Sequence, residues 1–320
     1  MRTGIPGYLG SLKNTNLKRK SLNLTNSSTK IPVEGTVNLN SLTFYYRNWG
    51  GSGKSVILLH GLASNSRIWD LVAPILASTS SVIAIDQRGH GKSDKPPVGY
   101  DFNSVTEDIA QFIIKMKIHN PVIVGHSWGG SVALSLAVRH PSLVSGLCLI
   151  DGGLIEISRV PGNTLELALD RMAPPLWDGV TEQEVMDRMK RRNWGTRDTT
   201  SLSASLEDIV MANLTVGDDG FVKARLSREN HLEIVRAFWT HRPSDMFPQV
   251  QCPVLILPAR LGPPDDERSE FRQQMVSLAR QTIPTSKVIW LENSIHDVPL
   301  QRPELVSQLI AERIENGFFL

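Results

Sequence analysis

The fold is decided by the stretch Pro121-Val122-Ile123-Val124-Gly125-His126-Ser127-Trp128-Gly129-Gly130. A short apolar run typical of a strand ends at Gly125, and a helical pattern begins two residues after Ser127. A sharp turn from strand to helix strains the backbone of its middle residue, and glycines two positions away on either side remove the collisions that Cβ atoms would cause. The pattern therefore predicts that the Ser127 hydroxyl stands exposed above a sheet edge, near backbone N–H groups of the new helix.

Strand and helix patterns alternate on both sides of this stretch. Mostly apolar runs predict buried strands at residues 56–59, 82–85, 144–150, 253–257 and 287–291. Helices are predicted at residues 66–77, 104–117 (opened by a capping box at Ser104 and Glu107), 129–140 and 269–281, and from residue 303 onward. Strands that are apolar on both faces imply a parallel sheet with helices on both sides. We therefore expect an α/β fold with a mostly parallel, twisted sheet.

The alternation stops between residues 152 and 248. This segment shows no convincing strand pattern, several amphipathic helical patterns, and a capping box at Thr181-Glu182-Gln183-Glu184. Because strands resume afterwards, we interpret residues 152–248 as a helical lid inserted into one core formed by residues 32–151 and 249–320. A second independent domain is the alternative. The methionines and tryptophans of the segment indicate either an apolar substrate wall or packing within the lid itself.

Charge is unevenly distributed along the 320 residues. The net charge is +2, but residues 1–30 carry six basic residues and no acidic one, so the remainder carries −4. This mildly acidic remainder gives no support for a nucleic-acid groove. We expect residues 1–31 to form a disordered basic leader, since no apolar segment of a secretory signal follows the basic residues, with an organellar transit peptide as the alternative.

Other features point to a cytoplasmic protein that acts on a small molecule. No apolar run approaches the roughly 18 residues of a membrane-spanning helix. Cys148 and Cys252 adjoin apolar runs and are interpreted as buried thiols. The stretch Gly50-Gly51-Ser52-Gly53-Lys54-Ser55 lacks the first glycine of a phosphate-binding loop, and a strand follows it where a helix is required. We expect neither a cofactor nor a metal ion.

Four motifs occur in an order typical of one family. They are His60-Gly61 after a strand, Asp86-x-Arg88-Gly89-x-Gly91-x-Ser93, the stretch around Ser127, and a late His296 after the last strand. Over residues 33–316 the chain resembles the α/β-hydrolase fold, in particular the esterase-like serine hydrolases that carry a helical lid.

The resemblance implies a catalytic triad. A serine hydroxyl is a weak nucleophile at neutral pH, so an imidazole must take its proton and an anion must hold the imidazole in the correct tautomer. Ser127 would be the nucleophile and His296 the base. The backbone N–H groups of Leu62 and Trp128 would form the oxyanion hole, in a loop that we expect His60 to organise.

The acid of the triad has two candidates. The family usually places it a few residues after the strand at 253–257, where the first carboxylates are Asp265 and Asp266. These two residues also suit the start of the helix that follows. Some members carry the acid at the end of the preceding strand, which is Asp151 here. We favour Asp151, with Asp265 as the alternative.

The expected activity is hydrolysis of a carboxylic ester or lactone of a small, largely apolar substrate through an acyl-enzyme. Haloalkane dehalogenases and epoxide hydrolases use aspartate at the elbow, so Ser127 argues against both. Acyl transfer or C–C bond hydrolysis on the same triad is one alternative. A non-catalytic ligand-binding or receptor role is another, because the fold alone does not separate these functions.

Overall fold

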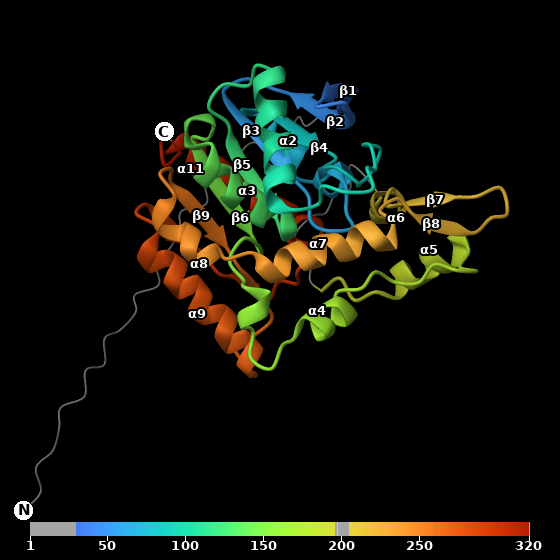
Figure 1. The fold of residues 1–320 in the computed structure, drawn as a ribbon. Helices are drawn as coiled ribbons and strands as arrows, with labels where there is room; N and C mark the ends of the chain where they lie inside the picture. The colour runs from blue at the N-terminus through green and yellow to red at the C-terminus, as the bar shows by residue number, and fades with distance from the viewer. Residues whose placement is uncertain (1–29, 196, 198–204, 320) are drawn as a thin grey trace, which may run out of the picture.

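The computed structural model describes residues 30–195, 197 and 205–319, so the predicted leader lies outside the described residues except for its last two positions. Among the described residues, eight strands form one sheet in the order β1-β2-β4-β3-β5-β6-β9-β11 (Figure 1). The first two pairs are antiparallel and all the others are parallel. The strands are β1 (Val33–Leu39), β2 (Leu42–Gly50), β3 (Lys54–Leu59), β4 (Ser80–Ile85), β5 (Val122–His126), β6 (Gly146–Ile150), β9 (Val254–Leu257) and β11 (Ser286–Val288). The predicted α/β fold with a mostly parallel sheet is confirmed.

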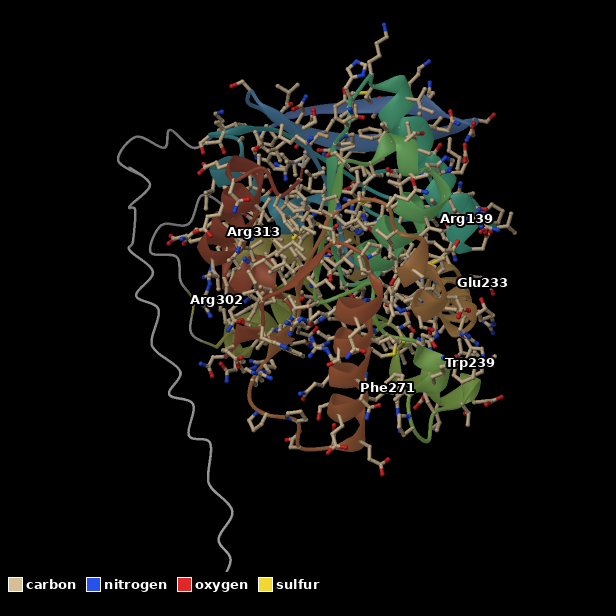
Figure 2. The ribbon with its side chains drawn as sticks, turned by 90° about the vertical axis from the view of Figure 1, so that its left-hand side faces the viewer. Arg139, Glu233, Trp239, Phe271, Arg302 and Arg313 are labelled. Atoms are coloured by element: carbon tan, nitrogen blue, oxygen red, sulfur yellow. The ribbon has the colours of Figure 1, made fainter. Side chains whose placement is uncertain are left out.

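Helices cover both faces of this sheet. They are α1 (Ala73–Leu76), α2 (Phe102–Lys115), α3 (Trp128–Arg139), α9 (Glu267–Thr282), α10 (Val298–Gln301) and α11 (Pro303–Glu315). Successive strand residues alternate between two buried clusters. Ile57 belongs to the cluster that includes residues of α2, α3 and α9, whereas Leu58 belongs to the cluster that includes residues of α1 and α11. Figure 2 accordingly shows Arg139 of α3 and Arg313 of α11 on opposite sides of the sheet. Both faces are thus buried, as apolar strands require.

Three local predictions were wrong in detail. The helix expected at residues 66–77 is a 3₁₀ turn (Ser66–Trp69) followed by the short α1, because Pro74 removes a backbone donor and constrains the residue before it. The helix expected from Ser104 begins at Phe102, where Asp101 is the N-cap and accepts from the Ser104 N–H at 3.0 Å. The strand expected at 287–291 divides into β11 and β12 (Leu291–Glu292), which pairs with β10 (Ala259–Arg260).

The described part of residues 152–248 contributes no strand to the main sheet and gathers at one end of it, where α7 runs across the core (Figure 1). The helices of this inserted segment are α4 (Leu165–Arg171), α5 (Glu182–Arg191), α6 (Leu206–Met211), α7 (Arg228–Thr240) and α8 (Pro243–Met246). The expectation that it contains no strand was wrong, because β7 (Leu214–Val216) and β8 (Val222–Ala224) form an antiparallel hairpin. Strands of three residues are too short to show an alternating pattern.

The motif that begins at Asp86 has a structural role. The Asp86 carboxylate is buried and accepts from the backbone N–H groups of Ser66 at 2.7 Å and Lys92 at 2.8 Å. Arg88 forms a two-pronged ion pair with Asp108 of α2, at 2.5 and 2.7 Å. These contacts hold the loop after β4 against α2 and against Ser66, which lies in the segment that follows β3.

Candidate active site

Ser127 occupies the tight turn between β5 and α3. Its backbone has φ 53° and ψ −121°, a conformation that residues other than glycine rarely adopt. A Cβ atom on Gly125 would lie 2.3 Å from the carbonyl oxygen of Gly129, and a Cβ on Gly129 would lie 2.4 Å from that of Leu59. Both positions therefore require glycine, because any Cβ atom would collide with the neighbouring backbone, as the sequence pattern predicts.

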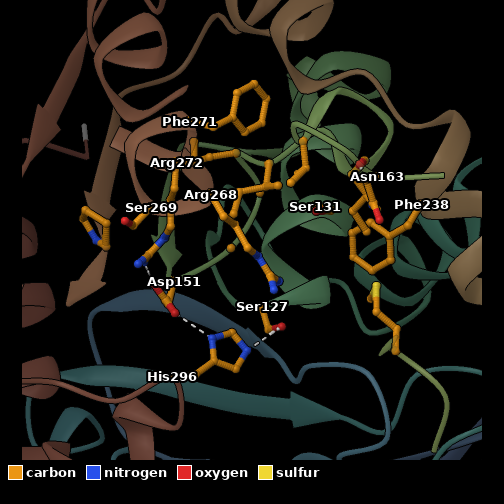
Figure 3. A pocket seen from close by; sticks show the side chains of 18 of the residues that line it. Ser127, Ser131, Asp151, Asn163, Phe238, Arg268, Ser269, Phe271, Arg272 and His296 are labelled. Carbon is orange, nitrogen blue, oxygen red and sulfur yellow. Dashed lines mark hydrogen bonds and ion pairs between the residues drawn. The ribbon is translucent and has the colours of Figure 1, made fainter. Parts of the chain in front are cut away.

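The structure brings Ser127, His296 and Asp151 together (Figure 3). The Nε2 atom of His296 lies 2.9 Å from the Ser127 hydroxyl oxygen, and its Nδ1 atom lies 2.6 Å from Oδ2 of Asp151. Asp151 directly follows β6, which is the neighbour of β5 in the sheet, and His296 lies in the loop before α10. Residues up to 169 positions apart in the chain thus form one hydrogen-bonded series.

Asp151 is held as an anion by three donors. Its Oδ1 atom accepts from the backbone N–H of Ala259 at 2.9 Å and from the Arg272 guanidinium, while Oδ2 faces His296. Burial raises the pKa of the carboxyl, but the hydrogen bond from His296, the charge of Arg272 and the Ala259 N–H outweigh it, so the pKa lies below its ordinary value. An ionised carboxylate can stabilise an imidazolium beside it.

The surroundings of His296 favour the protonated form of its ring. Burial lowers its pKa, but the hydrogen bond with Asp151 and the negative charges of Asp151 and Asp297 raise it, and the net pKa lies above the ordinary value. When the ring is neutral and Nδ1–H donates to Asp151, the Nε2 lone pair faces the Ser127 hydroxyl. The series can therefore accept the hydroxyl proton at Nε2.

Asp265 does not contact His296. It is exposed and precedes α9, whose N-cap is the adjacent Asp266, which accepts from the Ser269 N–H at 2.7 Å. Asp266 thus caps the start of α9, as expected if these two aspartates begin a helix.

The loop after β3 packs directly against the elbow. A Cβ atom on Gly61 would lie 3.1 Å from Cβ of Ser127. Two buried histidines hold this loop in place through hydrogen bonds. Nε2 of His60 accepts from the Gln87 backbone N–H at 3.0 Å, and Nε2 of His90 accepts from the Ala63 N–H at 3.2 Å. Burial lowers the pKa of both rings. Neutral rings can keep accepting these hydrogen bonds, which is consistent with the organising role expected for His60.

Leu62 and Trp128 lie on the two segments that meet at the elbow. Neither backbone N–H donates a hydrogen bond to another group of the described chain. The Trp128 side chain is buried and stacks on His90 at 5.1 Å between ring centroids. Neither residue lines the cavity that contains Ser127 and His296, so their assignment as an oxyanion hole stays a prediction.

A cavity of about 570 Å³ opens over Ser127 and His296, within the size range of small-molecule sites. The inserted segment supplies an apolar wall formed by Leu154, Ile157, Val160, Met172 and Phe238. In the ranges that the structure describes, no three His, Cys, Asp or Glu side chains are grouped as metal ligands, and no helix has the length and apolar character needed to cross a bilayer.

Sequence reasoning missed three arginines of this cavity, Arg171 of α4 and Arg268 and Arg272 of α9. The last two are four residues apart and therefore lie on the same face of α9, which turns toward Ser127 and Asp151 (Figure 3). The available signal was an arginine in the first turn of a predicted helix, where a positive charge is unfavourable. Arg272 is bound to Asp151 and also donates to the carbonyl of Ala259 at 2.6 Å.

Comparisons with known proteins agree with this architecture. Residues 56–309 match the model of the alpha/beta hydrolase family. The 2-(acetamidomethylene)succinate hydrolase of Mesorhizobium japonicum is 39% identical over 101 residues, 32% of this chain and 36% of that protein. A soluble epoxide hydrolase of a Corynebacterium species is 38% identical over 108 residues, 33% of this chain and 38% of that protein. Each match thus spans little more than a third of the relative's length.

Solved structures extend the similarity over most of the chain. The crystal structure of E-2-(acetamidomethylene)succinate hydrolase superimposes with a TM-score of 0.71 and 23% identity, covering 89% of this chain and 99% of that one. At this identity the likeness shows the fold alone. Together with the family match over residues 56–309, it establishes that this chain belongs to the alpha/beta hydrolase family.

Proposed function

We propose that this protein hydrolyses a carboxylic ester or lactone of a small molecule through an acyl-enzyme on Ser127. The observation that carries the proposal is the hydrogen-bonded series from Asp151 through His296 to Ser127, with distances of 2.6 and 2.9 Å, at the floor of a cavity. The serine and histidine are already within the reach that proton transfer requires.

In the proposed reaction, the Ser127 oxygen attacks the acyl carbon while its proton passes to Nε2 of His296. Asp151 stabilises the resulting imidazolium through Nδ1. The tetrahedral intermediate then expels the alkoxide, which takes the proton from His296, and leaves an acyl group on Ser127. A water molecule gives a proton to His296 and attacks this acyl group, and the carboxylic acid is released as Ser127 recovers its proton.

We propose further that residues 152–248 act as a cap. Their apolar side chains make one wall of the cavity, and Phe238 of α7 and Met172 after α4 both face it. A wall of this composition favours an apolar acyl or alcohol group on the substrate. The same residues also belong to or pack on a buried cluster of the core, so they serve packing as well.

A labelling experiment tests the nucleophile. A fluorophosphonate probe should modify Ser127, and the wild-type protein should hydrolyse members of a panel of p-nitrophenyl esters and lactones of graded length. Ser127→Ala should keep its melting temperature and lose both labelling and turnover. Ser131→Ala is the matched control, because Ser131 also lines the cavity but has no histidine partner in the described structure.

The outcomes separate the candidate functions. Labelling of Ser127 without hydrolysis of any ester or lactone would reject ester cleavage and favour acyl transfer or C–C bond hydrolysis. Full activity in Ser127→Ala would reject the acyl-enzyme on Ser127. A correctly folded wild type that shows neither labelling nor turnover would favour a ligand-binding role.

A further inference from the structure

Arg268 lies at a position in α9 where its positive charge does not stabilise the helix. It is the second residue of α9, and a cation in the first turn of a helix is opposed by the positive end of the helix dipole. Its side chain is exposed, lines the cavity, and extends from α9 toward Ser127 (Figure 3). A ligand in the cavity would therefore meet this guanidinium directly.

The charges around Arg268 leave its guanidinium available to a ligand. Arg272, one turn further along α9, is paired with Asp151. Among the described residues, no carboxylate forms an ion pair with Arg268. Asp266 is close enough to feel the charge, but its pKa is lowered first by hydrogen bonds from Ser269 and only to a smaller degree by Arg268. The Asp266 carboxylate is thus already engaged as the N-cap of α9.

The chemistry of the cavity has two sides. A guanidinium presents a rigid fork of N–H donors that matches a carboxylate with two parallel hydrogen bonds. The inserted segment presents an apolar wall, which includes Leu154 and Phe238, and one further guanidinium, that of Arg171. Ser127 lies in the same cavity as both features, so a substrate held by the two would place its central bond near the serine.

We propose that Arg268 binds a carboxylate of the substrate. This inference rests on the proposed function and narrows it: the substrate class is an ester with an apolar group on one side of the scissile bond and a free carboxylate on the other. Such substrates include monoesters of dicarboxylic acids and esters of short hydroxy acids. Arg268 would position the substrate and take no proton during the reaction.

Two pairs of esters test this. The first pair is monobutyl succinate and neutral butyl pentanoate, which differ in charge on the acyl side. The second pair is 4-butanoyloxybutanoate and neutral pentyl butanoate, which differ in charge on the alcohol side. The wild type should show a higher kcat/KM for the charged member of at least one pair.

The variant Arg268→Gln should lower kcat/KM for that charged ester roughly tenfold, mainly through KM, and change the neutral ester less than about twofold. The matched control is Arg280→Gln, an exposed arginine at the other end of the same helix and outside the cavity. This control variant should leave kcat/KM unchanged for both the charged and the neutral ester. Equal effects of Arg268→Gln on both members of a pair would overturn the carboxylate site and leave ester hydrolysis by Ser127 intact.

Binding gives a measurement that does not need turnover. Monobutyl succinate or 4-butanoyloxybutanoate should bind Ser127→Ala in a calorimeter, and about tenfold more weakly when Arg268→Gln is added. Absence of binding of both esters, or equal affinity with and without Arg268, would overturn the proposal. If binding follows this expectation but no ester is hydrolysed by the wild type, the carboxylate site is correct and the proposed function is wrong.

Discussion

Replacing Asp151 by asparagine tests the hydrogen-bonded series at its most informative point. The amide offers one oxygen and one NH₂ group in place of two carboxylate oxygens. The Oδ1 position accepts from two donors, the Ala259 N–H at 2.9 Å and the Arg272 guanidinium, whereas Oδ2 faces only His296. The amide oxygen will therefore occupy the Oδ1 position, and the NH₂ group will face Nδ1 of His296.

This orientation changes the tautomer of His296. An NH₂ group cannot accept the Nδ1 proton, so the neutral ring will carry its proton on Nε2, the atom that lies 2.9 Å from the Ser127 oxygen. Nε2 then has no lone pair with which to take the hydroxyl proton. The equivalent change in a serine protease lowers kcat by ~10⁴, which corresponds to about 5.5 kcal/mol of barrier height. We expect a loss of this size here.

The fold should survive the substitution. The Arg272 side chain is 27% exposed and stays partly hydrated when its carboxylate partner is removed. We therefore expect the free energy of unfolding to fall by roughly 1–3 kcal/mol, between the values for exposed and buried pairs. The measurements are kcat on the best ester of the panel and a thermal melt.

The control is Asp265→Asn, which changes an exposed carboxylate that does not contact His296. It should retain nearly full kcat. If Asp151→Asn keeps more than a tenth of the wild-type kcat, or if Asp265→Asn loses as much activity as Asp151→Asn, the assignment of the acid is refuted.

Three further substitutions follow from the same geometry. Gly125→Ala puts a Cβ 2.3 Å from a backbone carbonyl oxygen of α3, so the elbow must shift; we expect a loss of roughly 1–3 kcal/mol in unfolding free energy and much slower fluorophosphonate labelling, and an unchanged melt with normal labelling would contradict this. Arg272→Gln removes a positive charge that lowers the pKa of His296, so that pKa should rise and the acidic limb of the kcat/KM profile should move to higher pH; movement to lower pH would argue against His296 as the base. His90→Phe keeps a ring but leaves the Ala63 N–H without its acceptor, so kcat should fall with little change in KM if the loop after β3 supplies the predicted oxyanion donor, whereas an unchanged kcat would show that this contact does not position the loop for catalysis.

The sequence by itself determined the features that depend on short stretches of chain. The turn at Ser127 could be predicted because a strand, two spaced glycines and a helix within ten residues leave few backbone paths. The buried parallel strands could be predicted because a strand covered on both faces is apolar at nearly every position. The β7–β8 hairpin could not, because its strands of three residues carry too little pattern.

Tertiary structure decided which carboxylate meets His296. Both candidates follow strands, β6 and β9, that are neighbours in the sheet, so their carboxyl ends emerge side by side and strand order does not separate them. The backbone N–H of Asp151 donates to the Leu257 carbonyl at 3.0 Å, which holds Asp151 at the sheet edge, while Asp265 lies beyond the edge near the start of α9.

Tertiary structure also decided that Arg268 and Arg272 face the cavity. A helix with exposed basic residues is usually interpreted as having a solvated face, and the sequence does not show how the helix is rotated about its axis. In α9 that rotation is set by Met275, Val276 and Ala279, which are buried against the core. Because these three residues are packed against the core, the N-terminal end of α9 is oriented so that Arg272 reaches Asp151 and Arg268 extends toward Ser127.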